Sequence, residues 1–216
     1  EVTVNGQVLS APRFLVATGS SPTVPDVPGL RDTPYLTSDL LTSHEDTELT
    51  ELPASLIILG GGYIALELGQ MFARFGTRVT ILTRGERILS AYEPEIAQSV
   101  AEVFREEGIA IYTKATVSRV QGDERHVVLS LQVDGRQQEL TAAKLLVATG
   151  RTPNTAHLGL DLPGVDLDER GFVKVNDELR TSAWHVYAAG DVIGSYTGSQ
   201  MATPVGAQDG GIAAEN

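Results

Sequence analysis

Three small residues, Gly60, Gly62 and Ala65, have a spacing that suits the binding of a diphosphate. In the pattern GxGxxG/A the first glycine makes a tight turn and the second lets a pyrophosphate approach the backbone. The third small residue lets a helix pack closely on a sheet. The three residues follow the apolar run SLIIL (55–59) and open a helix-like segment, which is the context in which the pattern is specific. The spacing therefore predicts a dinucleotide-binding turn, with a purely structural glycine turn as the alternative interpretation.

The backbone of this turn supplies the predicted ligands. The N–H groups of a helix's first turn have no partner within the helix and carry the positive end of its dipole, so they stabilise an anion. The N–H groups predicted to bind the diphosphate are those of Gly62, Tyr63 and Ile64.

The choice between NADPH and NADH depends on the residues that end the next strand, RVTILT (78–83). NAD-binding proteins usually place an acid there, about 20 residues beyond the glycines, to bind the ribose 2′-hydroxyl. No carboxylate ends this strand, and Arg84 and Arg87 follow it. Because a guanidinium group complements a 2′-phosphate, we expect NADPH. Because Glu86 lies in the same loop, NADH is not excluded as the cofactor. An alternative interpretation of Arg84 and Arg87 is that they are solvated loop charges.

The segments around the turn alternate between strand-like and helix-like patterns. The all-apolar run at 55–59 is typical of a parallel strand that is covered on both faces. Apolar residues recur at helical spacing in 60–76 and in 93–107, and strands are expected at 78–83 and 144–150. This alternation predicts an α/β fold, a Rossmann-like three-layer nucleotide-binding domain.

Turn residues and β-rich runs indicate the other elements. Asn5-Gly6 and Asp134-Gly135 each separate two β-rich stretches and predict hairpins. A helix is expected at the end of 204–216. Further strands are expected at 14–19, 109–112, 115–120, 126–133, 136–140, 172–176 and 185–192.

The pentapeptide LVATG occurs twice, at 15–19 and at 146–150, each time with a proline three residues beyond its glycine. Chance recurrence of a common strand ending is one interpretation. We favour two related nucleotide-binding folds in one polypeptide, because the two copies flank the predicted βαβ unit.

Charge and composition narrow the possible functions. Lys plus Arg is 16 and Asp plus Glu is 28, so the formal net charge is −12. Such a chain repels nucleic-acid phosphates and anionic membrane surfaces, and we expect neither as a partner. Because the chain has no cysteine, disulfides and thiolate nucleophiles are excluded within these residues. No metal site is expected, since the four histidines are scattered: His44, His126, His157 and His185.

The sequence also bears on location. No apolar run approaches the ~18 residues of a membrane span, and no signal peptide is visible. We therefore expect a cytoplasmic protein. The chain opens at Glu1 with strand character, so we expect an internal part of a longer polypeptide.

Four stretches occur in a characteristic order: LVATGSSP (15–22), GGGYIALELG (60–69), LVATGRTPNT (146–155) and AAGDV (188–192). In order and approximate spacing they resemble the flavin-dependent pyridine nucleotide–disulfide oxidoreductases. The segment ATPV (202–205) after the Gly-Asp pair is similarly placed in that family. The resemblance covers essentially the whole chain.

This resemblance implies an FAD-binding domain that is interrupted by a nicotinamide domain, with FAD and NADPH as cofactors. Residues 1–35 are expected to end the first FAD segment, 36–152 to form the NAD(P)-binding domain, and 153–216 to form the second FAD segment. The nucleotide-binding domain is thus expected to be inserted in a partial FAD-binding domain. The parent protein is expected to be a homodimer.

The resemblance also implies roles for single residues. Tyr63 resembles the tyrosine that covers the flavin until nicotinamide displaces it, and Glu67 the acid beside the nicotinamide. Arg84 resembles the ligand of the 2′-phosphate, and Gly150 is expected at the NADPH site. Asp191 is expected to bond the flavin ribityl chain. The other residues expected at FAD are Thr18, Gly19, Arg151, Gly190, Met201, Ala202 and Thr203.

Each of these roles has a simpler alternative. Tyr63 is also consistent with a surface ring at a helix start, and Glu67 with a solvated charge. Asp191 is also consistent with a turn residue, and Met201 with a core filler.

Within the family, the stretches YLTSDLL (35–41), 51–82 and EPEIAQSV (93–100) look most like the mercuric reductase branch, in which a cysteine pair binds Hg(II). The family's redox cysteines, first FAD glycine motif and C-terminal interface domain are absent from these 216 residues, so we expect the chain alone to be inactive. The expected parent passes hydride from NADPH to FAD and on to a cysteine pair outside this chain, with a small molecule or metal ion, here mercury(II), as substrate. A dihydrolipoamide dehydrogenase, a glutathione-reductase-like enzyme and a non-catalytic dinucleotide-binding module are the alternatives.

Overall fold

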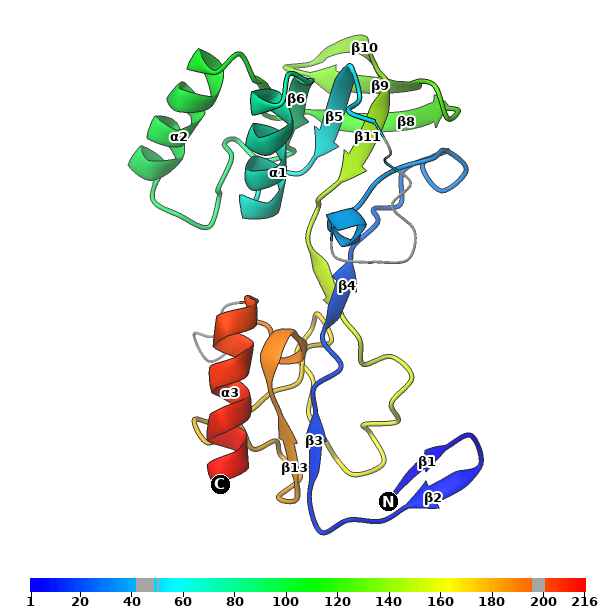
Figure 1. Cartoon of the computed structure of the whole chain (residues 1–216), viewed down its shortest axis with the longest axis vertical. Helices are drawn as coiled ribbons and strands as arrows, with labels where there is room; N and C mark the ends of the chain where they lie inside the picture. Colours follow the sequence, from blue (N-terminus) through cyan, green and yellow to red (C-terminus); the bar gives the residue numbers. More distant parts are fainter. Residues whose placement is uncertain (42–48, 50, 196–200) are drawn as a thin grey trace. The chain divides into compact units, whose positions relative to one another are not determined.

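The computed structural model describes residues 1–41, 49, 51–195 and 201–216. The chain forms two compact units (Figure 1). The continuous unit comprises 22–150, and the split unit comprises 1–21 and 151–216. The split unit is therefore assembled from two segments that the continuous unit separates in the sequence.

A four-stranded parallel sheet forms the centre of the continuous unit, with strand order β11-β5-β6-β7. A helix follows each of the strands β5 and β6, as the alternating pattern predicts. The elements are β5 (Ser55–Leu59), α1 (Tyr63–Arg74), β6 (Arg78–Leu82), α2 (Pro94–Glu106), β7 (Ala110–Tyr112) and β11 (Lys144–Val147). Ahead of them lies the 3₁₀ turn η1 (Ser38–Leu41).

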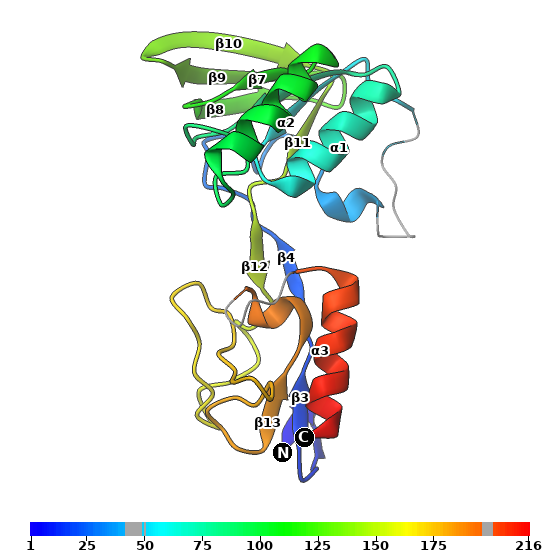
Figure 2. The same ribbon diagram turned by 90° about the vertical axis from the view of Figure 1, so that its left-hand side faces the viewer.

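Strand β5 is buried on both faces. Because side chains alternate across a strand, its residues contribute in turn to two different cores. Leu56 and Ile58 belong to the core beneath the helices, whereas Ile57 and Leu59 belong to a second core. Helices α1 and α2 lie next to one another on one side of the sheet (Figure 2). The antiparallel sheet β8-β9-β10 covers the other side, which confirms the predicted three-layer α/β fold.

The covering sheet is a meander of β8 (Thr116–Gly122), β9 (Val127–Val133) and β10 (Arg136–Ala142). Asp134 and Gly135 join β9 to β10 with φ angles of 48° and 79°. Two successive positive φ values are what a tight two-residue hairpin turn requires, so this predicted hairpin is confirmed.

The split unit is built around a parallel pair of strands, with β3 beside β13. Helix α3 packs against it through Ala213, which shares a core with the buried residues of β13. The N-terminal hairpin predicted at Asn5-Gly6 is also present. The elements are β1 (Val2–Val4), β2 (Gln7–Leu9), β3 (Phe14–Val16), β4 (Ser20–Pro22), β12 (Arg151–Pro153), β13 (Val186–Ala188), η2 (Gly190–Ile193, a 3₁₀ helix) and α3 (Thr203–Glu215).

The two LVATG copies end in equivalent positions. Each leads from a parallel strand, β3 or β11, through a glycine with positive φ into a short strand, β4 or β12. Strands β4 and β12 pair with one another where the chain passes between the units. The sequence repeat therefore corresponds to two connections of the same kind.

The first division between the units falls after residue 21, whereas the sequence analysis placed the domain boundary after residue 35. The intervening segment packs on the continuous unit. Leu30 is completely buried in the core between the two sheets, and Gly29 approaches the carbonyl of Val120 so closely that a Cβ would collide with it. The Val120 N–H also donates to the Pro28 carbonyl at 2.9 Å.

The strand predicted at 172–176 is wrong. Val173 and Val175 are buried as an alternating strand would require, but only an isolated bridge from Val173 to Leu167 forms. The Lys174 N–H donates to the Asp166 carbonyl and the Asp168 N–H to the Phe172 carbonyl, and these two bonds form the single bridge. Within the described residues the pairing does not extend beyond this bridge into a ladder.

Candidate functional site

The turn between β5 and α1 has the geometry that the glycine pattern predicts. Gly60 has a φ of 131°, and a Cβ there would collide with the Ala148 carbonyl oxygen. Its N–H donates to the Leu82 carbonyl at 2.9 Å, which fixes the turn against β6. Ala65 is completely buried where α1 meets the sheet. Gly60 and Ala65 are therefore required by packing.

Gly62 differs from its neighbours because no atom of the described residues lies within 4 Å of the position that a Cβ would occupy. It is the N-cap of α1, with φ −86° and ψ 178°, and no side chain caps the helix there. Among the described residues, the space beside the N-cap of α1 is therefore open, and no capping side chain compensates the helix dipole there. Such a helix end is suited to bind an anion.

Two further glycines bring α1 close to the sheet, and the sequence analysis did not single them out. A Cβ on Gly61 would lie 2.9 Å from the Thr83 Oγ1 atom. A Cβ on Gly69 would lie 3.2 Å from the Ile58 Cδ1 atom. Gly69 stands on the buried face of α1. Its spacing from Gly62 and Ala65 along the predicted helix is the sequence signal that could have identified it.

The two arginines in the loop that follows β6 have different environments. Arg84 is exposed and makes no hydrogen bond or ion pair within the part of the chain that the structure describes. Arg87 is half-buried, and its Nη2 atom donates to the carbonyls of Ser90 and Tyr92 at 3.2 and 3.1 Å. Glu86 forms an exposed ion pair with another residue, Lys114, at 3.2 Å.

Tyr63 and Glu67 lie one helical turn apart on α1 and line the same shallow groove of about 320 Å³. The Tyr63 side chain is 41% exposed, and Glu67 is exposed as well. The other lining residues come from both helices and the connecting loop, and the sequence analysis did not assign them to a site: Leu66, Gln70, Leu89, Tyr92, Ile96 and Phe104.

A polar network joins three segments of the split unit. The Ser20 hydroxyl donates to the Asp191 Oδ2 atom at 2.8 Å, and the Arg151 Nε atom donates to the Ser20 Oγ atom at 2.6 Å. Arg151 also lies 3.5 Å from the same carboxylate oxygen and donates through Nη2 to the Ser20 carbonyl at 2.6 Å. The structure thus brings the predicted residues Arg151 and Asp191 together, through a serine that the sequence analysis did not select.

The loop around Thr18 and Gly19 is held by Asn154. The Asn154 side-chain amide donates to the Thr18 carbonyl at 2.9 Å, and its backbone N–H donates to the Gly19 carbonyl at 3.0 Å. The Thr18 hydroxyl donates back to the Asn154 carbonyl at 2.9 Å. In the continuous unit, Gly150 accepts from the Thr23 N–H at 2.9 Å, so each LVATG glycine is bonded through its carbonyl.

The start of α3 adjoins η2. A Cβ on Gly206 would lie 3.3 Å from the Gly190 Cα atom, so the two glycines allow a close approach. The Gly190 N–H faces the buried carboxylate of Asp209 at 3.4 Å. The predicted FAD residues at this end of the helix are the half-buried Met201 and the exposed Ala202 and Thr203. Ala202 is the N-cap and offers no capping side chain.

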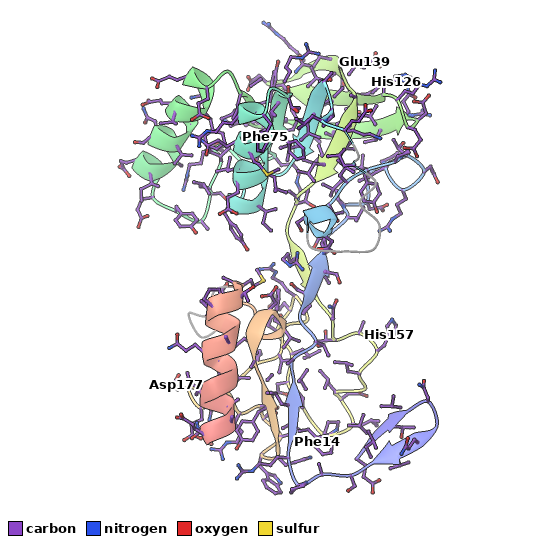
Figure 3. The ribbon with its side chains drawn as sticks, in the orientation of Figure 1. Phe14, Phe75, His126, Glu139, His157 and Asp177 are labelled. Carbon is purple, nitrogen blue, oxygen red and sulfur yellow. The ribbon has the colours of Figure 1, made fainter. Side chains whose placement is uncertain are left out.

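Within the described residues, no group of three or more His, Asp or Glu side chains is placed to hold a metal ion. His126 stands beside the covering sheet of the continuous unit and His157 in a loop of the split unit (Figure 3). His44 lies outside the described residues. None of the described helices is both long enough and apolar enough to span a membrane.

Comparison with known proteins gives a consistent result. The family model of the pyridine nucleotide-disulphide oxidoreductases matches residues 1–210. A mercuric reductase of Staphylococcus aureus is 42% identical over 215 residues, 100% of this chain and 38% of that protein. A dihydrolipoyl dehydrogenase of Thermus scotoductus is 40% identical over 195 residues, 89% of this chain and 41% of that protein.

The chain is also similar to solved structures of a flavoprotein disulfide reductase. The HOCl-induced flavoprotein disulfide reductase RclA of Escherichia coli, in its Cu(II) complex, superposes with a TM-score of 0.80 at 36% identity, covering 94% of this chain and 44% of that one. The chain thus spans less than half the length of these relatives. With the glycine turn, both LVATG connections and the Gly-Asp segment in place, it belongs to the pyridine nucleotide-disulphide oxidoreductase family.

Proposed function

We propose that the continuous unit binds NADPH and that the whole protein is an NADPH- and FAD-dependent oxidoreductase that reduces Hg(II). The observation that carries the proposal is the open, uncapped N-terminus of α1 at Gly62, beside a strand end that presents a free arginine and no carboxylate. The proposed NADPH domain is the segment 36–152, which lies within the continuous unit of 22–150 except for its last two residues.

The residues present fit a dinucleotide phosphate. The space at Gly62 accommodates a diphosphate against the backbone, and the N–H groups of Gly62, Tyr63 and Ile64 bind it. Arg84 is exposed and has no acceptor among the described residues, so its guanidinium is available for the 2′-phosphate. Gly150, which ends the β11 segment, is assigned to the same cofactor.

The nicotinamide half of the cofactor is assigned to the groove on α1. Tyr63 offers an exposed ring that can cover or uncover an adjacent flat group, and Glu67 places a carboxylate one turn further along the same face. We assign to Tyr63 the role of the ring that covers the flavin until nicotinamide displaces it. We assign to Glu67 the role of orienting the nicotinamide.

The residues of the split unit fit an FAD ribityl chain. Every hydrogen bond and ion pair of Asp191 within the described residues uses Oδ2, so Oδ1 can accept from a ligand hydroxyl. Ser20 and Arg151 hold the carboxylate in place for that contact. Bound FAD supplies the step that accepts a hydride and passes two electrons onward. The remaining residues assigned to FAD are Thr18, Gly19, Gly190, Met201, Ala202 and Thr203.

Mercury(II) is proposed as the substrate because several relatives at 40–44% identity are named mercuric reductases. The two electrons would reduce Hg(II) to Hg(0). The chain has no cysteine, so the thiols that hold the ion must be supplied from outside these 216 residues. A dihydrolipoyl dehydrogenase activity is the second candidate, favoured by the Thermus scotoductus relative.

The proposal is tested with the full-length protein carrying FAD. NADPH consumption should depend on added Hg(II) in the presence of excess thiol, and should be much slower with lipoamide or oxidised glutathione. Faster turnover with lipoamide would favour the second candidate. No NADPH consumption with any of the three acceptors would contradict the oxidoreductase assignment.

A further inference from the structure

The loop that links β6 to α2 folds back on the glycine turn. The Leu89 N–H donates to the Gly61 carbonyl at 2.7 Å, and the Tyr92 N–H donates to the Leu89 carbonyl at 2.9 Å. At the loop's other end, the Lys114 N–H donates to the Gly85 carbonyl at 2.9 Å. Backbone hydrogen bonds thus hold the loop both to the glycine turn, at Gly61, and to the segment after β7, at Lys114.

The conformation of Leu89 requires these contacts. Its φ of 48° lies in the left-handed region, which a leucine rarely adopts because its Cβ crowds the backbone there. A residue in this conformation persists only where its surroundings hold it. Leu89 and Tyr92 also line the groove that contains Tyr63 and Glu67, so the loop conformation determines one wall of that groove.

Arg87 lies inside this loop and bonds its backbone. Its Nη2 atom donates to the carbonyls of both Ser90 and Tyr92, which brackets the turn after Leu89. Its Nε atom is buried and has no acceptor among the described residues, so the guanidinium is turned in toward the loop. The following residue, Ile88, is 1% exposed and anchors the loop in the helix-side core.

We infer that Arg87 is a positioning residue that clamps the loop 84–92 in the conformation in which the Leu89 N–H reaches the glycine turn, and that it is not a ligand of the cofactor phosphate. Arg84, three residues earlier and exposed, is then the one arginine of this loop that reads the 2′-phosphate. The part about phosphate rests on the proposed NADPH binding. The clamp itself rests only on the contacts within the loop.

The clamp is tested first without any cofactor, by hydrogen exchange of the loop amides. In Arg87→Met, which removes both hydrogen bonds but keeps an unbranched apolar side chain, the Leu89 and Tyr92 amides should exchange at least about tenfold faster. Arg84→Met is the matched control and should leave these rates unchanged. Unchanged rates in Arg87→Met, with the thermal midpoint measured alongside, would overturn the clamp.

Arg87→Lys keeps the charge, but its ammonium nitrogen ends one bond short of the position of the Arg87 Nη2 atom, so it should give an intermediate exchange rate. It also serves if Arg87→Met does not fold. Protection equal to that of the wild type in Arg87→Lys would mean that the reach of the Arg87 guanidinium does not hold the loop, which overturns the inference.

Cofactor affinity then separates the two arginines. Arg87→Met should weaken NADPH and NADH by the same factor, because it disturbs the loop that both share. Arg84→Met should weaken NADPH alone. Selective loss of NADPH in Arg87→Met would make Arg87 a phosphate ligand and overturn the inference. If the wild type binds neither cofactor, the proposed function fails, while the exchange experiment still decides the clamp.

Discussion

Arg84 stands where β6 ends, at the position that distinguishes the two nicotinamide cofactors. We expect Arg84→Ala to weaken NADPH binding by about 1.5–3 kcal/mol, the range of a hydrogen bond to a charged group, and to spare NADH. Titration calorimetry with both cofactors measures the difference.

Arg119→Ala is the control for charge alone, because it removes the same charge from an exposed site on β8. It should leave both affinities unchanged. Equal losses for NADPH and NADH in Arg84→Ala would show that the side chain supports the fold or the surface and does not read the phosphate.

Ser20 is expected to stabilise the split unit by joining Arg151 to Asp191. In Ser20→Ala, two partly buried charged groups lose their common partner, and we expect a loss of about 1–2 kcal/mol in the free energy of unfolding. The adjacent Ser21 bonds the Asn154 side chain at an exposed site, so Ser21→Ala should cost no more than about 0.5 kcal/mol. Urea unfolding of both variants measures this difference, and equal losses would contradict the role of the network.

The residue types of the candidate site carry more sequence signal than the residues that support it. Gly60 and Ala65 stand where close packing requires a small residue, Gly62 completes the pattern, and Arg84 follows a strand. Ser20 and Asn154 were not, since a hydroxyl or amide in a loop acquires its partner only through the fold. The different environments of Arg84 and Arg87 likewise depend on loop conformation, which the sequence does not reveal.

Helices α1 and α2 are joined at their C-terminal ends by Arg74 and Glu107. The guanidinium donates to both carboxylate oxygens, at 2.7 and 3.2 Å, and these hydrogen bonds hold the pKa of Glu107 below its usual value of 4.5. Because the folded-state pKa is lowered, the stabilisation is fully present above pH 4.5 and is lost as the pH falls through the lowered pKa.

We therefore expect the stability difference between the wild type and Glu107→Gln to be constant above pH 4.5 and to shrink below it. Urea midpoints across this range measure the difference. Glu106→Gln is the control, since Glu106 makes no ion pair among the described residues. A difference that grows on acidification would contradict this assignment.

The elements that a strong pattern indicated are present, and those that depended on distant partners were misjudged. The apolar run at 55–59 and the helical spacing in 93–107 gave β5 and α2 nearly as expected, because burial on both faces or on one face leaves a local signature. The segment 172–176 alternates between apolar and polar residues, yet among the described residues it forms only an isolated bridge with Leu167. Alternation of apolar and polar residues indicates which side chains are buried. A β-strand also requires a neighbouring strand with which its backbone can form hydrogen bonds.

The split unit exposes much apolar surface. All six residues of strands β1 and β2 are exposed, Val8 by 58%, and a two-stranded hairpin is marginal on its own. Leu15 on β3 is 52% exposed and Trp184 73%. Such surface favours self-association through apolar contacts and open strand edges.

We expect the isolated 216-residue polypeptide to self-associate and to carry no flavin. Size-exclusion chromatography with an absorbance scan measures both properties. A monodisperse monomer with flavin bands in its spectrum would contradict this expectation and would show that the split unit alone retains FAD. Charged replacement of Val8 should reduce association, whereas Thr3→Lys on the same hairpin serves as the control for added charge.

The proposed binding of NADPH depends on the open space at Gly62, and titration calorimetry of NADPH with the 216-residue chain measures it. The wild type should bind one NADPH per chain. Gly62→Ala should fold normally, because a Cβ there meets no atom within 4 Å, yet should lose at least about tenfold in affinity, since the methyl group occupies the phosphate site. Gly210→Ala, equally unhindered in α3, should bind as the wild type does. Absence of NADPH binding, or binding that Gly62→Ala leaves intact, would contradict the assignment.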